Sequence, residues 1–228
     1  MESGEAFLNS SDSRGMSKVS EIVEQANSLF DVVGARRLSG SENLLILGLE
    51  STAERNLDEF GHLDGNFQMY GFAKHVGFRL EAVLNVIRGQ GFSAEPVGRY
   101  GYPLKGEINL KTEAIRAGLG KRGKSTVVLH PEYGPRLRFM AIGTDAPLEP
   151  LIGPPFADEK NPICNGCSIC IDVCPTKALE PYRMPDTSLC LSNITPVTED
   201  GRSILCDECL HLCPAANTHC HDPIMTQL

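Results

Sequence analysis

The sequence lacks long apolar runs, basic runs and a secretion signal. No window reaches the ~18 uninterrupted apolar residues that a membrane-spanning helix needs, so we expect neither a transmembrane segment nor a membrane partner. Residues 1–16 are polar and acidic, unlike a signal peptide, and are predicted to be a disordered tail of a cytoplasmic protein. The 21 basic and 29 acidic residues give a formal net charge of −8, with no basic run that could follow a phosphate backbone. Nucleic acid is therefore not expected as a direct partner.

The acidic excess is concentrated toward the C-terminus. Residues 157–228 hold ten acidic and four basic side chains, whereas residues 1–156 hold 19 and 17. An acidic surface of this kind would attract an electropositive partner. It would equally serve to keep the protein soluble, and the sequence leaves both interpretations open.

All nine cysteines lie in this acidic part, and eight of them have spacings typical of a ferredoxin with two iron-sulfur clusters. The first run reads Cys-x2-Cys-x2-Cys-x3-Cys-Pro, and the second places one cysteine far ahead of Cys-x2-Cys-x3-Cys-Pro. Each iron of a cubane cluster needs one thiolate, and the cysteine before the proline serves the other cluster in this pattern. The predicted ligands are Cys164, Cys167, Cys170 and Cys213 for the first cluster, and Cys174, Cys190, Cys206 and Cys209 for the second.

Two other uses of cysteine stay open. Cys-x2-Cys pairs also bind structural zinc, although four-ligand zinc sites would leave the remaining spacing unexplained. A disulfide framework fits less well, because the cysteine count is odd and no secretory signal is present. The ninth cysteine, Cys220, lies between His219 and His221 and is interpreted as a spare thiol or, with these histidines, as a metal site.

Apolar periodicity predicts helices and a strand ahead of the cysteines. Helical spacing extends over residues 19–33 and again over residues 72–87. A short apolar run at residues 44–49 indicates a buried strand. A third helix is expected to end at Gly118.

Turn-forming residues divide the rest of the chain. Residues 126–129 and 136–142 form a hairpin candidate around a Pro-Glu-Tyr-Gly-Pro turn. Five prolines within residues 146–163 predict an irregular linker. The expected domains are therefore residues 17–150 and 151–228.

Three further segments resemble one known family. They read Ala-Gly-Leu-Gly-Lys-Arg-Gly-Lys over residues 117–124, His-Pro-Glu-Tyr-Gly-Pro-Arg-Leu-Arg over 130–138, and Gly-Thr-Asp-Ala-Pro-Leu over 143–148. The two cysteine runs with their remote cysteine follow. This combination resembles the cobalamin-dependent reductases, namely the epoxyqueuosine reductases and the reductive dehalogenases. The resemblance extends from about Tyr70 to Cys213.

The resemblance implies an α+β protein: a nitroreductase-like α/β domain that can hold a corrin ring, then a ferredoxin-like domain with two 4Fe-4S clusters. Electrons would pass from a donor such as a ferredoxin or flavodoxin through the clusters to a cobalamin-type cofactor, for reduction of a small substrate. The glycine segment would let the backbone approach a flat ligand, or would form a helix cap and tight turn without a ligand. The cofactor-binding candidates are Gly118, Gly120, Gly123 and Lys124.

The proton donor departs from the family pattern. Epoxyqueuosine reductases usually carry an acidic donor shortly upstream of the glycine segment, but residues 97–110 contain no aspartate. Glu107 is one catalytic candidate. Because dehalogenases use a tyrosine, Tyr100 and Tyr102 are the others, although a tyrosine in a loop also serves for packing.

Two hypotheses follow. In the first, the protein is an oxidoreductase that uses the clusters and a cobalamin. In the second, it is a non-catalytic electron-transfer module that reduces or reactivates a partner, such as a corrinoid protein. The missing aspartate favours the second hypothesis, as does the lack of the helical repeats with which many epoxyqueuosine reductases hold transfer RNA. The retained glycine segment favours the first, which we prefer.

Overall fold

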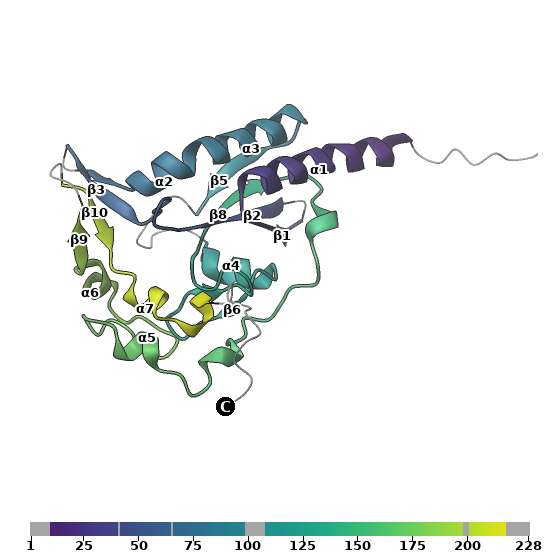
Figure 1. Cartoon of the computed structure of the whole chain (residues 1–228). Coiled ribbons are helices and arrows are strands. Elements are labelled where there is room, and N and C mark those ends of the chain that lie inside the picture. Colours follow the sequence, from purple (N-terminus) through teal and green to yellow (C-terminus); the bar gives the residue numbers. More distant parts are fainter. Residues whose placement is uncertain (1–9, 41, 65, 99–107, 198–200, 218–228) are drawn as a thin grey trace, which may run out of the picture.

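A four-stranded antiparallel sheet forms the centre of the molecule (Figure 1). The computed structural model describes residues 10–40, 42–64, 66–98, 108–197 and 201–217. The strands follow the order β1-β2-β8-β5. They are β1 (Val32–Ser39), β2 (Glu42–Glu50), β8 (Leu137–Thr144) and β5 (Ala94–Val97). With its helices, this sheet confirms the mixed α and β composition that the resemblance implies.

Strand β2 is buried on both faces. Leu45 and Leu47 belong to one apolar cluster, whereas Leu44 and Ile46 belong to another. Alternate residues of a strand point to opposite faces, so a strand with both faces covered must be apolar throughout. The buried strand predicted at residues 44–49 is therefore confirmed.

Helices cover both faces of the sheet (Figure 1). Helices α1 (Ser10–Leu29) and α3 (Gly77–Gly89) pack on one face, and α4 (Leu110–Arg116) packs on the other. Ile22 of α1 and Ile115 of α4 lie in the two separate apolar clusters. Within the described residues, no helix is both long enough and apolar enough to cross a membrane.

The first helix has other limits than those predicted. It ends at Leu29 and not at residue 33, because Val32 and its neighbour begin β1 and pair with β2. Valine is β-branched and favours strands, so a helical period can continue into a segment that is not helical. The helix begins at Ser10, within the segment predicted to be a tail, and residues 1–9 lie outside the described residues.

The second predicted helix, over residues 72–87, consists of two. Helix α2 (Tyr70–His75) and helix α3 meet at Val76, which caps the end of α2 and the start of α3 and belongs to neither. Gly77 follows it, and glycine is a poor helix former. The apolar stripe nevertheless continues through this break, because Val76 is buried with the residues of α3.

The predicted hairpin of residues 126–129 and 136–142 is wrong. Strand β7 (Val128–Leu129) pairs with β6 (Lys121–Arg122), and β8 lies between β2 and β5. Both faces of β8 are apolar, which requires a central position in the large sheet. The helix predicted to end at Gly118 is confirmed as α4.

A second sheet joins the N-terminal and C-terminal parts of the chain. Its order is β4-β3-β10-β9. Strand β10 pairs with β3, with Ser203 opposite Phe60 (Figure 1). The predicted units 17–150 and 151–228 therefore share a sheet. The strands are β3 (Glu59–Leu63), β4 (Asn66–Gln68), β9 (Ile194–Pro196) and β10 (Ser203–Leu205).

The C-terminal part is built from short turns of helix. They are η1 (Glu149–Leu151), η2 (Pro162–Cys164), α5 (Ile169–Asp172), α6 (Thr187–Leu191), α7 (Glu208–His211) and η3 (Pro214–Asn217). The proline-rich linker of residues 146–163 holds only such turns. It is nevertheless attached to β6, because the Arg122 N–H donates to the Glu159 carbonyl at 2.8 Å.

Candidate metal centre

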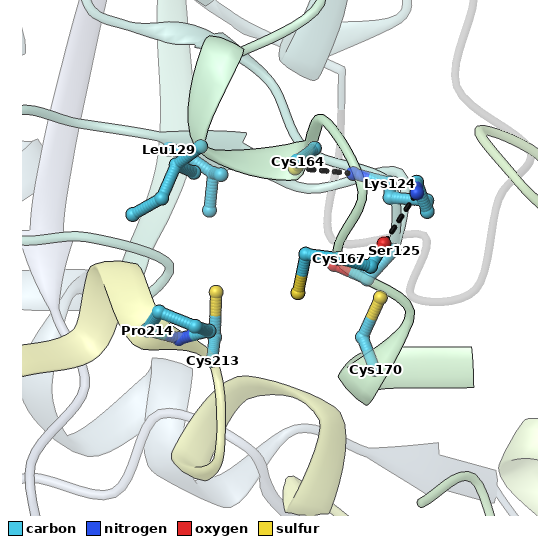
Figure 2. Close-up of a pocket in the computed structure, with 9 residues that line it drawn as sticks. Lys124, Ser125, Leu129, Cys164, Cys167, Cys170, Cys213 and Pro214 are labelled. Atoms are coloured by element: carbon cyan, nitrogen blue, oxygen red, sulfur yellow. Dashed lines mark hydrogen bonds between the residues drawn. The ribbon is translucent and has the colours of Figure 1, made fainter. Parts of the chain in front are cut away.

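Four cysteines from two distant parts of the chain line one cavity. Cys164, Cys167 and Cys170 come from the first run, and Cys213 comes from the second. Figure 2 shows the sulfur atoms of Cys167, Cys170 and Cys213 turned toward a common space. The empty space between these residues, counted together with the open solvent at its mouth, is about 320 Å³. Its other lining residues are Lys124, Ser125, Leu129, Ile163 and Pro214. These cysteines, called the first set below, are the predicted ligands of the first cluster.

One tight loop places the first three of these cysteines. The Asn161 side chain accepts a hydrogen bond from the backbone N–H two residues on, at 3.0 Å, and so begins the turn η2. Gly166 has a φ of 72°, which glycine adopts at little cost. Across this turn the Cys167 N–H donates to the Cys164 carbonyl at 3.3 Å, and Cys170 follows in α5. The two-residue spacers thus wrap the loop around the cavity.

The other four cysteines, the second set, lie beside the first. Cys190 and Cys209 pack against the buried cluster that contains Cys174. Burial, and then the nearby thiolates of Cys190 and Cys206, raise the pKa of Cys209 to about 12. Burial also raises the pKa of Cys190, with Cys174 and Cys206 adding to the effect. The predicted ligands of the second cluster are therefore neighbours in space.

The two sets adjoin at α5. Cys170 of the first set lies in this helix, and Cys174 of the second set follows its C-terminal cap. Both are buried in one apolar cluster. The charge of Cys170 also contributes to the raised pKa of Cys209. Two redox groups held by these sets would therefore be neighbours, as electron transfer between them requires.

The electrostatics of the first set favour a bound cation. Burial, followed by the charges of Cys213 and Cys164, raises the pKa of Cys170 to about 11. Four thiolates in so little water repel one another, so at neutral pH this thiol keeps its proton. A metal centre reverses the balance, because its charge stabilises the thiolates and displaces their protons. The donor set therefore fits a positively charged, thiophilic group.

The geometry of the first set fits an iron-sulfur cluster better than a single ion. Among the described residues, no three His, Cys, Asp or Glu side chains gather closely enough to hold one metal ion. The cysteines instead surround a cavity. A cubane cluster takes one thiolate for each of its four irons, whereas zinc draws its ligands to one point, with a Zn–S distance of about 2.3 Å.

Hydrogen-bond donors surround Cys174 of the second set. Burial raises the pKa of this thiol, but hydrogen bonds from the Thr176 side chain and from the backbone N–H groups of Ala178 and Leu179 outweigh it, and the pKa is lowered. Donors of this kind stabilise negative charge on a cluster ligand and thereby raise the reduction potential. The hydrogen bonds around Cys174 would therefore adjust the reduction potential of a cluster bound by the second set.

The glycine segment packs against the protein itself. The Gly118 N–H donates to Ile115 and the next N–H donates to Ala114, both at 2.9 Å, which is the Schellman cap of α4. A Cβ at Gly120 would lie 2.6 Å from the Leu129 carbonyl oxygen. These contacts support the cap-and-turn interpretation, and Gly123 likewise borders Leu129. Contact of these glycines with a corrin stays a prediction.

Lys124, the last residue of the segment, binds the first cysteine loop. Its backbone N–H donates to the Cys164 sulfur at 3.3 Å, and its Nζ donates to the Cys167 carbonyl (Figure 2). Lys124 is one of the predicted cofactor-binding residues. In the structure its ammonium group binds a backbone amide carbonyl of the protein, that of Cys167.

The other predicted site residues cannot be placed. Tyr100, Tyr102 and Glu107 lie outside the described residues, as does Cys220 with its two neighbouring histidines. Their predicted roles stay predictions.

Lys111 is a residue that the sequence analysis did not single out. It lies in α4, and its Nζ donates to the Thr126 hydroxyl at 3.4 Å. Burial, then the charges of Arg138 and Arg122, lower its pKa, whereas the thiolates of the second set act in the opposite direction. A cation of the N-terminal part therefore lies within electrostatic reach of the second set. Nothing in the spacing of one lysine in a short helix indicates this contact.

His130 makes the start of the Pro-Glu-Tyr-Gly-Pro turn sensitive to pH. Its Nδ1 accepts the backbone N–H groups of Glu132 at 3.1 Å and Tyr133 at 3.3 Å. Burial lowers the pKa of His130 below its ordinary value of about 6.5. Protonation of Nδ1 would remove this acceptor, so the folded state binds the proton less readily than the unfolded state.

We therefore expect the stability that His130 contributes to be present above pH ~6.5, the unfolded pKa, and to be lost as the pH falls below that value. The variant His130→Asn keeps a side-chain acceptor but does not titrate. Its unfolding free energy, measured by urea denaturation between pH 5 and 8, should depend less steeply on pH than that of the wild type. Equal slopes would show that His130 does not control this turn.

The fold and the paired cysteine sets define an α+β protein with adjoining cysteine-rich loops, and comparisons with known proteins agree with this class. No family model matches the chain. An epoxyqueuosine reductase of Listeria monocytogenes is 33% identical over 124 residues, which are 50% of this chain and 31% of that protein. The Bacillus subtilis enzyme is 31% identical over 119 residues, 48% of this chain and 29% of that protein. The chain is thus related in sequence to epoxyqueuosine reductases, and its match spans about a third of their length.

Solved structures share the fold. A crystal structure of an epoxyqueuosine reductase matches 89% of this chain and 66% of its own, with a TM-score of 0.61 and 18% identity. A catabolic reductive dehalogenase matches 86% of this chain and 31% of its own, with a TM-score of 0.57 and 18% identity. The resemblance to these two groups of reductases is therefore confirmed.

One of these structures corrects an expectation about partners. An epoxyqueuosine reductase with a TM-score of 0.59 and 18% identity, covering 89% of this chain and 66% of its own, was solved with a stem loop of epoxyqueuosine-modified tRNA. The expectation that nucleic acid is not a direct partner conflicts with this finding. Net charge alone does not decide such a question, because a local surface can bind RNA within an acidic protein.

Proposed function

We propose that this protein is an oxidoreductase in which two 4Fe-4S clusters deliver electrons to a cobalamin-type cofactor. The observation that carries the proposal is the pairing of cysteines from both runs into two adjoining sets of four. The relationship to epoxyqueuosine reductases supports it, because these relatives are named as reductases.

The first set would hold one cluster and the second set the other, and each cluster supplies one-electron transfer when bound. The protein's own part is to keep the two sites adjacent through α5 and to exclude water around them. Cys170, Cys174 and Cys164 are all buried. An external donor such as a ferredoxin or flavodoxin would be oxidised. Each two-electron reduction of the substrate would require two successive one-electron transfers from the donor through the clusters.

The second set also lies close to the N-terminal part. Lys111 of α4 lies within its electrostatic reach. The predicted proton donors Tyr100, Tyr102 and Glu107 shortly precede this helix in the sequence. One of them would donate the proton that accompanies reduction.

Two substrate classes follow from the relatives. The epoxyqueuosine reductases favour a modified nucleoside of tRNA, and one of their structures holds such a stem loop. The dehalogenase, solved with 3-bromo-4-hydroxybenzoic acid, favours a small organic molecule. The sequence relationship is to the epoxyqueuosine reductases, so we place the modified nucleoside first.

A second candidate function is a non-catalytic electron-transfer module that reduces a corrinoid partner protein. The absence of aspartate between residues 97 and 110 favours it, since the relatives' usual proton donor has no counterpart there. This module would keep both clusters but would not bind a free corrin.

Cobalamin binding separates the two candidates. Protein purified without oxygen would be incubated with excess cobalamin, passed through a desalting column and analysed for cobalt and for visible absorption. We expect about one cobalamin per chain to remain bound, as a single pocket would hold. Heat-unfolded protein serves as the control. Retention equal to that of the unfolded control would contradict the enzyme and favour the electron-transfer module.

A further inference from the structure

Lys124 engages the C-terminal part with three groups, two of which contact the first cysteine loop. Its backbone N–H donates to the Cys164 sulfur at 3.3 Å, and its Nζ donates to the Cys167 carbonyl. Its own carbonyl accepts the Tyr182 N–H at 2.9 Å. Tyr182 has a φ of 64°, an uncommon conformation for a bulky residue. One residue of the N-terminal part is therefore fixed to three points of the C-terminal part.

A second contact holds the other side of the same cavity. A Cβ at Gly134 would lie 2.1 Å from the carbonyl oxygen of Ala215, two residues after Cys213. Arg136 donates to the carbonyl of Ala216 and also binds the Glu50 carboxylate at 2.6 Å. The loop that carries Cys213 is thus pressed against the end of the large sheet.

These two contacts flank Leu129, which packs with both cysteine loops. Leu129 is 2% exposed and lies in one cluster with Cys164, Ala215 and Cys213. Leu129 also lines the cavity. The N-terminal part therefore supplies a wall of the cavity and a hold on each of the two loops that supply its cysteines.

From this geometry we propose that Lys124, Gly134 and Arg136 form a clamp that positions the ligands of the first cluster, with Lys124 as its central residue. The proposal rests on the proposed function, because it takes the first set to hold a cluster. The glycine segment and the Pro-Glu-Tyr-Gly-Pro turn thereby gain a role that involves no corrin.

The clamp has an electrostatic consequence as well. The Lys124 ammonium group lies beside the Cys167 backbone, at the edge of the cavity. A cluster becomes more negative when it is reduced, so a nearby fixed cation stabilises the reduced form and raises the midpoint potential. A lysine whose charge lies far from the cavity would not shift the potential of a cluster that is still bound, because solvent and salt screen distant charges.

Variants with a single complete set make the test specific. Cys190→Ser leaves only the first set complete, and Cys164→Ser leaves only the second. Lys124→Met would be introduced into each background. Lys121→Met is the matched control, because Lys121 lies in the same segment and its Nζ pairs with Glu159 at 2.7 Å on the exposed surface.

In the Cys190→Ser background, Lys124→Met should reduce bound iron at least twofold. The clusters that remain should have a lower midpoint potential, measured by redox titration followed by electron paramagnetic resonance. Lys124→Arg should restore iron content and potential in large part, since it keeps the charge. In the Cys164→Ser background, Lys124→Met should change neither quantity, and Lys121→Met should change neither in both backgrounds.

Unchanged iron and unchanged potential after Lys124→Met in the Cys190→Ser background would overturn the clamp. Equal iron loss in both backgrounds would also overturn it, because it would reveal a general folding defect. Absence of iron from the wild-type protein, measured alongside, would contradict the proposed function itself. The two failures are therefore distinguishable.

Discussion

Replacing Cys190 by serine is expected to halve the iron content, from about eight to about four atoms per chain. Cys190 is the remote member of the second set, packed beside Cys174 and Cys209. A serine oxygen is a harder and weaker ligand for iron than a thiolate, so the second cluster would lose one corner. The first set contains no ligand from α6 and should keep its cluster. Iron and acid-labile sulfide analysis of protein purified without oxygen measures the change.

Cys220→Ser is the matched control, since it makes the same substitution at the cysteine outside both sets. It should keep about eight irons. Loss of all iron in the Cys190 variant would mean that the two sites form only together. An unchanged count would remove Cys190 from the ligands.

Gly134→Ala is the second substitution with a large expected effect. Gly134 has a φ of 54°, and the new Cβ would lie 2.1 Å from the Ala215 carbonyl oxygen. The left-handed backbone costs an alanine about 1–2 kcal/mol, and overpacking a fixed backbone contact costs about 1–3 kcal/mol. We expect the unfolding free energy to fall by about 2–5 kcal/mol, measured by urea denaturation.

Gly89→Ala provides the control for this prediction. Gly89 is the last residue of α3, and a Cβ there would meet nothing within 4 Å. Since alanine is the better helix former, this variant should be neutral or more stable by up to about 1 kcal/mol. If both glycine variants behaved alike, the close approach of Gly134 to the Cys213 loop would not be a strong constraint.

The sequence predicted the elements whose pattern is local. The apolar run of β2 and the glycine cap that ends α4 just before Gly118 depend on neighbouring residues, and both were predicted correctly. The hairpin failed because β8 pairs with strands about forty and ninety residues before it, and no turn signal marks such partners. Likewise, the pairing of β3 with β10 crosses the predicted domain boundary. The composition of the proline-rich linker does not indicate that strands on its two sides pair with each other.

For the site, the ligand requirement of an iron-sulfur cluster predicted which cysteines lie together, whereas apolar periodicity gave no information on this. The crossed assignment of Cys213 to the first run came from the ligand requirement of a cubane, and the structure places it there. The partners of Lys124 were not predictable, because Cys164 is forty residues further along the chain. A glycine-rich segment followed by a lysine is also typical of ligand binding. Only tertiary contacts distinguish a segment that binds a ligand from one that packs against the cysteine loop.

The central claim is that the eight cysteines hold two iron-sulfur clusters. The most direct test is metal and acid-labile sulfide analysis of the wild-type protein, purified or reconstituted without oxygen. The account predicts about eight irons and about eight sulfides per chain. Zinc without sulfide would contradict it.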